Sequence, residues 1–162
     1  MSRRQRGFSL IELLIVVAII LIIVAIAIPN FLRSRIAANQ ASAIESMRII
    51  GTAEVTYFST YSTGFSTTMT VLGPPPAGQQ VSPTAAGLID EALAGGEKSG
   101  YSFSYNSTDF DAGSNKWYGY TLQANPDIVG QTGGMYYYTD QSHVIRGNAT
   151  MPAGSTDPAV GD

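Results

Sequence analysis

The sequence predicts an α+β protein in which one long N-terminal helix packs against a small antiparallel β-sheet of three or four strands. Three observations predict this fold class. An almost wholly apolar run lies near the N-terminus, a segment with helical periodicity follows it directly, and the second half of the chain alternates with a period of two. A sheet of this size needs one covered face, and the helix supplies the cover.

The apolar run is long enough to cross a bilayer. It extends from Phe8 to Leu32 with Glu12 as its single charged residue, and Leu13 to Ile28 are uninterrupted apolar residues. Three arginines precede it and no acidic residue does, so the positive-inside rule predicts a cytoplasmic N-terminus and an exported C-terminal part. A secretory signal peptide is the alternative. The residues that follow the run, Ile28-Pro29-Asn30-Phe31, match its small-residue cleavage site poorly.

Two residues inside this run have physical consequences. A carboxylate such as Glu12 costs about 2.5 to 3.5 kcal/mol at the centre of a membrane helix, so it needs a partner. The simpler explanation is an acidic residue favoured by the dipole of a helix N-terminus. Pro29 removes a backbone donor and clashes with the carbonyl of Ala25, which predicts a kink or a local opening of the helix. Its simpler explanation is that the membrane helix ends there.

The segment after Pro29 continues as an amphipathic helix. Asn30 to Tyr61 contains no proline and one glycine, and apolar residues recur every three or four positions. A helix from Phe8 to about Tyr61 would be about 80 Å long at 1.5 Å per residue. The residues of the predicted apolar stripe are Ala37, Ala41, Ile44, Met47, Gly51, Val55 and Phe58.

The rest of the chain is predicted to form a head. A loop rich in Gly, Pro, Ser and Thr precedes a short helix at Thr84–Gly95, and strands are expected at 101–105, 117–122, 135–139 and 143–146. The Pro/Gly/Thr/Asp composition from Asn148 onward indicates a flexible tail. The expected segments are 1–7, 8–32 (membrane), 33–61 (amphipathic helix), 62–98 (loop and short helix), 99–147 (sheet) and 148–162 (tail).

Composition excludes several kinds of chemistry. The chain has no cysteine and a single histidine, so a thiol nucleophile, a disulfide and a multi-histidine metal site are all absent. The formal charge of −3 and the scattered cations do not make a nucleic-acid surface. We expect no enzyme activity and no cofactor. Asp109, Asp111 and Asn115 space their oxygen atoms like the start of a calcium loop, but a hairpin turn requires the same residues.

The residues around Glu12 carry a resemblance to a known family. The segment Arg6-Gly7-Phe8-Ser9-Leu10-Ile11-Glu12-Leu13-Leu14-Ile15 resembles the leader junction of type IV pilins and pseudopilins, and the similarity extends to about Tyr61. The resemblance implies the pilin fold, and a cut between Gly7 and Phe8 by a prepilin peptidase that also N-methylates Phe8. It further implies that Glu12 of one subunit meets the Phe8 amine of a neighbour. The stretch before Pro29 loosens on assembly in such filaments.

The resemblance implies a structural subunit of a type IV pilus-like homo-oligomeric filament. Before assembly, such a subunit is held in the inner membrane as a single-pass protein (N-in, C-out), with its N-terminus on the cytoplasmic side. The assembly machinery of that membrane then moves it into an extracellular or periplasmic filament. One alternative is a pseudopilin of a type II secretion system. That class typically ends in an Asp/Gly-rich calcium-bearing segment, which residues 140–162 do not show. Another is a membrane-tethered periplasmic binding protein, which would show converging titratable groups in the head.

Overall fold

The computed structural model describes residues 8–160. The chain divides between Arg35 and Ile36 into two compact units, an apolar segment and a head. The helices are α1 (Leu10–Tyr61), α2 (Met69–Leu72) and α3 (Glu91–Ala94). The strands are β1 (Glu97–Lys98), β2 (Tyr101–Asp111), β3 (Lys116–Pro126), β4 (Tyr136–Asp140) and β5 (Arg146–Asn148).

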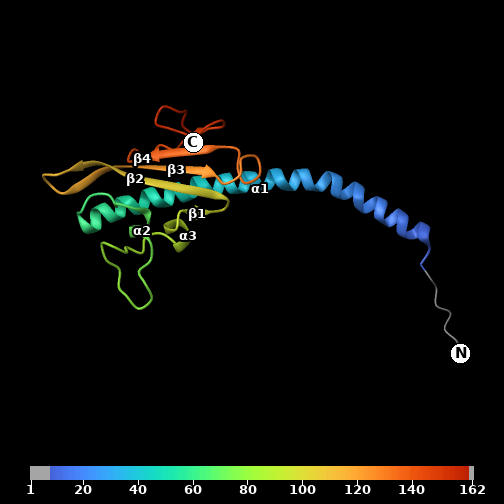
Figure 1. Ribbon diagram of the computed structural model, residues 1–162, viewed down its shortest axis with the longest axis horizontal. Helices are drawn as coiled ribbons and strands as arrows, with labels where there is room; N and C mark the ends of the chain where they lie inside the picture. Colours follow the sequence, from blue (N-terminus) through green and yellow to red (C-terminus); the bar gives the residue numbers. More distant parts are fainter. Residues whose placement is uncertain (1–7, 161–162) are drawn as a thin grey trace. The chain divides into compact units, whose positions relative to one another are not determined.

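The sheet confirms the predicted α+β class. Its five strands are arranged in the order β1-β2-β3-β4-β5, and each adjacent pair is antiparallel. Figure 1 shows the sheet lying along the second half of α1. The long β2–β3 hairpin, with Tyr101 opposite Pro126 and Asp111 opposite Lys116, forms the centre of the sheet.

The predicted number of three or four strands was too low, and the position of the last strand was wrong. Strand β1 has only two residues, Glu97 and Lys98, which is too short to produce an alternating pattern. The last strand lies at Arg146–Asn148 rather than at 143–146. His143 has a left-handed backbone with φ of 60°, which is incompatible with a strand. A turn therefore occupies the position at which the sequence predicted the start of this strand.

The buried face of α1 is rotated relative to the predicted stripe. Met47 and Gly51 are buried as expected, but Ala37 and Ala41 are exposed and Val55 is 51% exposed. Gly51 packs closely on the His143 ring, because a Cβ there would lie 2.7 Å from Nδ1 of His143. The buried residues of α1 are Ala43, Ser46, Met47, Ile50, Gly51, Ala53, Glu54 and Tyr57.

The core of the head lies between this face of α1 and the sheet. Met47 and Ile50 of α1 belong to one buried cluster with Tyr101, Tyr120 and Leu122 of the sheet. Tyr105 and Tyr120 stack with ring centroids 5.6 Å apart. Complete burial of one large apolar side chain contributes about 1.5 to 3 kcal/mol, so the buried cluster shared by α1 and the sheet stabilises their attachment.

The segment between α1 and the sheet contains two short helices instead of one. We expected a helix over Thr84–Gly95, but only Glu91–Ala94 is helical, and α2 lies within the stretch that we predicted to be a loop. Asp90 caps α3 by accepting a hydrogen bond from the Leu93 amide at 2.9 Å, and it pairs with Lys98 at 2.6 Å. The segment is held by its caps and by Leu72 and Leu93 in the core.

Residues 148–160 return to the sheet, although their composition predicted a flexible tail. The Asp157 carboxylate accepts hydrogen bonds from the Asn148 side chain and from the Gly154 amide. The Val160 amide donates to the Ile145 carbonyl at 2.8 Å, and Ala153 is buried. Gln123 and Arg146 also donate to the carbonyls of Ala153 and Asp157, so side chains and backbone groups together fasten this loop.

Candidate assembly site

The start of α1 holds Glu12 by a local hydrogen bond. Ser9 directly precedes the helix, and its amide donates to Oε2 of Glu12 at 2.9 Å. This is the Glu half of a capping box, in which the third helical residue reaches back to the residue before the helix. The contact keeps the carboxylate within one turn of Phe8, whose side chain is largely exposed. Gly7, the other residue of the predicted cut, lies outside the described residues.

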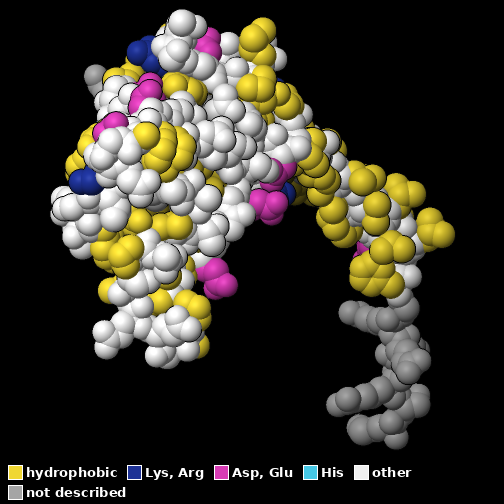
Figure 2. Space-filling view, turned by 60° about the vertical axis from the view of Figure 1, so that its left-hand side comes forward, with side chains coloured by type: hydrophobic (Ala, Val, Ile, Leu, Met, Phe, Trp, Pro, Cys, Tyr) yellow, Lys and Arg dark blue, Asp and Glu magenta, His cyan; other side chains and the backbone are white. Residues whose placement is uncertain are grey.

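The surface of α1 from Leu13 to Ile28 is apolar on all sides. Among the described residues, α1 is the one helix that is long and apolar enough to cross a membrane, with a mean hydropathy of 3.4 in its most apolar window. Figure 2 shows apolar side chains covering the helix next to the N-terminal residues drawn in grey. A side chain such as Ile19 or Leu21 is exposed to solvent in the isolated chain. Such a surface requires lipid or other apolar helices around it.

Pro29 lies within α1 and does not end it. The helix continues to Tyr61, which is inconsistent with the simpler explanation that the proline terminates the membrane helix. The Asn30 side chain donates to the Ile26 carbonyl at 3.2 Å, and the Ser34 hydroxyl donates to the Asn30 carbonyl at 3.0 Å. These side chains supply extra hydrogen bonds on both sides of the position where the backbone donor is missing.

A buried carboxyl group in the head was missed by the sequence analysis. Glu54 of α1 is completely buried and accepts hydrogen bonds from the amide and the hydroxyl of Ser66. Tyr105 of β2 donates to the Ser66 carbonyl at 2.9 Å. We call Glu54, Ser66 and Tyr105 the Glu54 cluster. One signal for it was present in the sequence, because Glu54 is seven residues after Met47 and three after Gly51, on the face of the predicted stripe.

Burial sets the electrostatics of the Glu54 cluster. Loss of solvation raises the pKa of Glu54 above its ordinary value, and the hydrogen bonds from Ser66 oppose that rise. Burial and the nearby Glu54 charge also raise the pKa values of Tyr105 and Tyr120. The cluster joins α1, the following loop and β2, and Glu54 and Ser66 are completely buried in it. We therefore assign it a structural role.

The three calcium candidates lie at the β2–β3 turn. Asp111 accepts hydrogen bonds from the amides of Gly113 and Ser114 and from the Ser114 hydroxyl, and these bonds lower its pKa. Asp109 and Asn115 have left-handed backbones with φ of 56° and 54°. Asp111 therefore stabilises the hairpin turn, which was the alternative to a calcium site at these residues.

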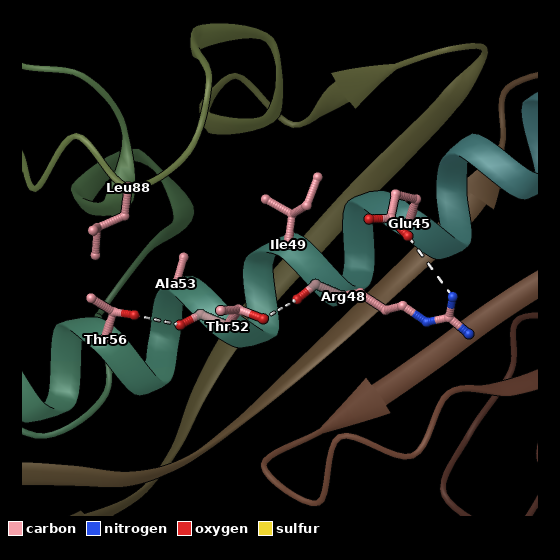
Figure 3. Close-up of a pocket in the computed structure, with 7 residues that line it drawn as sticks. All are labelled: Glu45, Arg48, Ile49, Thr52, Ala53, Thr56 and Leu88. Atoms are coloured by element: carbon pink, nitrogen blue, oxygen red, sulfur yellow. Dashed lines mark hydrogen bonds and ion pairs between the residues drawn. The ribbon is translucent and has the colours of Figure 1, made fainter.

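A shallow hollow of about 260 Å³ lies beside α1 in the head. In Figure 3, Ile49 and Ala53 of α1 lie on the same side of the helix as Leu88, which reaches toward it from another segment. Arg48 and Glu45 form an exposed ion pair at 3.8 Å, and a pair of this kind contributes little. The hollow has no histidine and no buried acid in its lining, so it lacks the groups that catalysis requires.

Comparison with known proteins supports the N-terminal features. Residues 2–28 match the prokaryotic N-terminal methylation motif. A segment of 56 residues is 50% identical to the type IV major pilin protein PilA of Myxococcus xanthus, and it covers 35% of this chain. The match spans about a quarter of that relative's length (26%). No solved structure matches the chain significantly.

The motif and the apolar helix together point to one class of protein. The N-terminal segment of this chain is similar to that of type IV pilins, which are structural proteins. It carries the prepilin-type leader, and the apolar helix is consistent with anchoring in the inner membrane before assembly.

Proposed function

We propose that this chain is a pilin, a structural subunit of a type IV pilus-like filament. A prepilin peptidase cleaves it between Gly7 and Phe8 and N-methylates the new Phe8 amine. The mature subunit remains in the inner membrane through the apolar part of α1, N-in and C-out. The assembly machinery then moves it into a homo-oligomeric filament outside that membrane. The observation that carries this proposal is the all-round apolar surface of residues 10–29 of α1, which is interrupted only by Glu12 near the processed end.

Glu12 provides the register of assembly in this proposal. When helices move from the membrane into a filament, each replaces its lipid neighbours with other apolar helices. Apolar packing alone therefore does not fix the axial position of one helix against the next. A carboxylate among apolar helices requires a counter-ion. Cleavage creates an ammonium group at Phe8, four residues away, and the next cation along the mature chain is Arg33. The pairing of Glu12 with the Phe8 amine of a neighbour neutralises both charges and sets the register.

Pro29 weakens the backbone hydrogen bonding of α1 at one point. The missing amide leaves the Ala25 carbonyl without its usual donor, so the turns before Pro29 are less strongly bonded than the rest of α1. We propose that these turns open when subunits pack in the filament. The Ser34 bond to the Asn30 carbonyl supports the helix after this point, and the Asn30 bond to the Ile26 carbonyl is one that such an opening would break.

The N-terminus of the chain in filaments tests the proposed function. Filaments sheared from cells are purified and their N-terminal peptide is analysed by mass spectrometry. We expect a peptide that begins with N-methylated Phe8. Recovery of the chain only as a full-length membrane protein, with residues 1–7 attached, would overturn the proposal and favour a membrane-tethered protein.

A pseudopilin of a type II secretion system is the second candidate, because the methylation motif is common to both kinds of filament. The relative named as a type IV major pilin favours the pilus. The arrangement of residues 148–160 also differs from a calcium-bearing end, since the Asp157 carboxylate is occupied by Asn148 and Gly154. Electron microscopy of cells separates the two: a pilin yields long surface filaments, and a pseudopilin does not at its natural expression level.

A further inference from the structure

The loop between β3 and β4, residues 127–135, exposes two adjacent apolar side chains. Ile128 is 52% exposed and Val129 is 56% exposed. Gly130 and Gln131, which follow them, are also exposed. Exposed apolar residues are common when they occur singly. Two β-branched neighbours at the tip of one loop form a small apolar surface that lacks a partner within the described head.

Internal hydrogen bonds fix this loop in shape. The Thr132 amide donates to the Ile128 carbonyl at 2.9 Å, and the Ile128 amide donates to the Thr132 hydroxyl at 3.1 Å. Gly133 packs so closely on Tyr101 that an added Cβ would overlap the phenol ring. Ile128 and Val129 cannot fold back into the core without breaking these contacts. The loop therefore presents its apolar tip as a preformed surface.

The loop is attached to α1 near the end of the apolar run. The Asn39 side chain donates to the Thr132 carbonyl at 2.8 Å. Among the side-chain hydrogen bonds that join α1 to other described segments, this one lies nearest the N-terminus. Figure 1 shows the β3–β4 connection beside this part of α1. Asn39 follows Leu32 by seven residues, a distance of about 10 Å in a helix and at most about 25 Å in an extended chain.

The charges near this point suit a phospholipid surface. Arg33 and Arg35 lie between the apolar run and Asn39, where cationic side chains meet lipid phosphates. Asp127, at the base of the loop, accepts a hydrogen bond from the Ser102 hydroxyl. The exposed tip itself, Ile128 to Gln131, carries no charge. Uncharged apolar side chains at the edge of a membrane bury themselves at the boundary between headgroups and acyl chains.

We propose that the 127–135 loop inserts Ile128 and Val129 into the outer face of the inner membrane while the subunit waits for assembly. This proposal rests on the membrane-held state described under the proposed function. The loop and α1 then form two points of attachment, which limits the orientations of the head before extraction. A phospholipid surface is the partner, and the contact is released when the subunit enters the filament.

Site-directed fluorescence tests the proposal on the full-length chain. The chain has no cysteine, so a single cysteine can be labelled cleanly. Three variants, Val129→Cys, Val81→Cys and Ile19→Cys, are labelled with a small environment-sensitive dye. Each is reconstituted at low protein density in phosphatidylethanolamine and phosphatidylglycerol vesicles containing lipids with a nitroxide at a shallow or a deep position. Val81 is the matched control, because it is 62% exposed and lies on a different loop.

We expect the shallow nitroxide to remove most of the fluorescence at position 129 and little at position 81, and the deep nitroxide to quench position 19. Equal, weak quenching at 129 and 81, with position 19 quenched, would overturn the loop contact and leave the membrane-held subunit intact. Absence of quenching at position 19 as well would overturn both. Shielding of position 129 only at high protein density would identify a second copy as the partner and also overturn the proposal.

Discussion

Glu54 makes the stability of the head depend on pH in an unusual direction. Its pKa is raised by burial, so the folded state favours the neutral acid. Stability from this group is fully present below the unfolded pKa, near 4.5, and is lost as pH rises through the raised folded pKa. Asp90, Asp111 and Asp140 act oppositely, because their lowered pKa values favour the folded state above about pH 3.8.

Glu54→Gln should therefore abolish the decline in stability above pH 4.5. Glutamine can accept from the Ser66 amide with its oxygen and donate to the Ser66 hydroxyl with its nitrogen. We expect the variant to be at least as stable as the natural chain at pH 7, as measured by thermal unfolding in detergent over a pH series. The matched control is Glu45→Gln, an exposed acid of the same helix. Identical pH profiles for the natural chain and Glu54→Gln would show that Glu54 does not titrate in the folded head.

Gly64 is required where the loop after α1 meets β3. Its φ is 90°, and an added Cβ would lie 2.5 Å from the Trp117 carbonyl oxygen. Gly64→Ala should destabilise the head by about 3 kcal/mol or more, because backbone atoms cannot move aside cheaply. Gly78 has a φ of 83° and no atom within 4 Å of an added Cβ. Gly78→Ala should cost only the left-handed backbone, about 1 to 2 kcal/mol. Equal losses in chemical denaturation would argue against the close contact.

At the scale of elements, Glu12 caps α1 and has a proposed role in assembly, and two substitutions separate these roles. Glu12→Gln retains an oxygen that can accept from the Ser9 amide but removes the charge, whereas Glu12→Ala removes both. Breaking a buried ion pair costs about 3 to 5 kcal/mol, so both variants should lower filament yield by about 100-fold or more. Insertion and cleavage should be unchanged. Immunoblots of sheared filaments against whole cells measure this, and normal piliation by Glu12→Gln would refute the ion pair.

The C-terminal loop provides a second test at this scale. Asp157→Ala removes two hydrogen-bond acceptors, for Asn148 and Gly154, and each such bond contributes about 0.5 to 1.5 kcal/mol. We expect faster hydrogen exchange and proteolysis within residues 149–160, and unchanged protection of β2 and β3. Asp157→Asn retains one oxygen and should give a smaller effect. Unchanged exchange in Asp157→Ala would mean that the backbone bonds of Val160 and Gly147, with the side-chain bonds of Gln123 and Arg146, are sufficient to hold the loop.

At the scale of the whole molecule, solubility and polymerisation depend on different parts of the chain. The boundary between Arg35 and Ile36 separates the apolar segment from the unit that contains the described sheet and core. A chain of residues 36–162 should be soluble, folded and monomeric, because the apolar surface of residues 8–32 is absent. Analytical ultracentrifugation and circular dichroism check this expectation. Filaments formed by residues 36–162 would contradict assembly through the N-terminal helix.

The sequence by itself determined the features that depend on local pattern. Sixteen consecutive apolar residues from Leu13 to Ile28 predict a helix that needs apolar surroundings, whatever the head does. The Gly7-Phe8 junction and Glu12 are recognisable because their chemistry is encoded in adjacent residues. Alternation over residues 101–105 and 117–122 predicted central strands for the same reason.

Only the tertiary structure decided which groups meet across long separations in the chain. The burial of Glu54 depends on Ser66 and on Tyr105, a residue of another element, and the attachment of the 127–135 loop depends on Asn39. The order of residues 148–160 depends on Asp157 and on backbone partners in the sheet. Such contacts are made by polar groups without periodicity, so their partners become known only when the chain has folded.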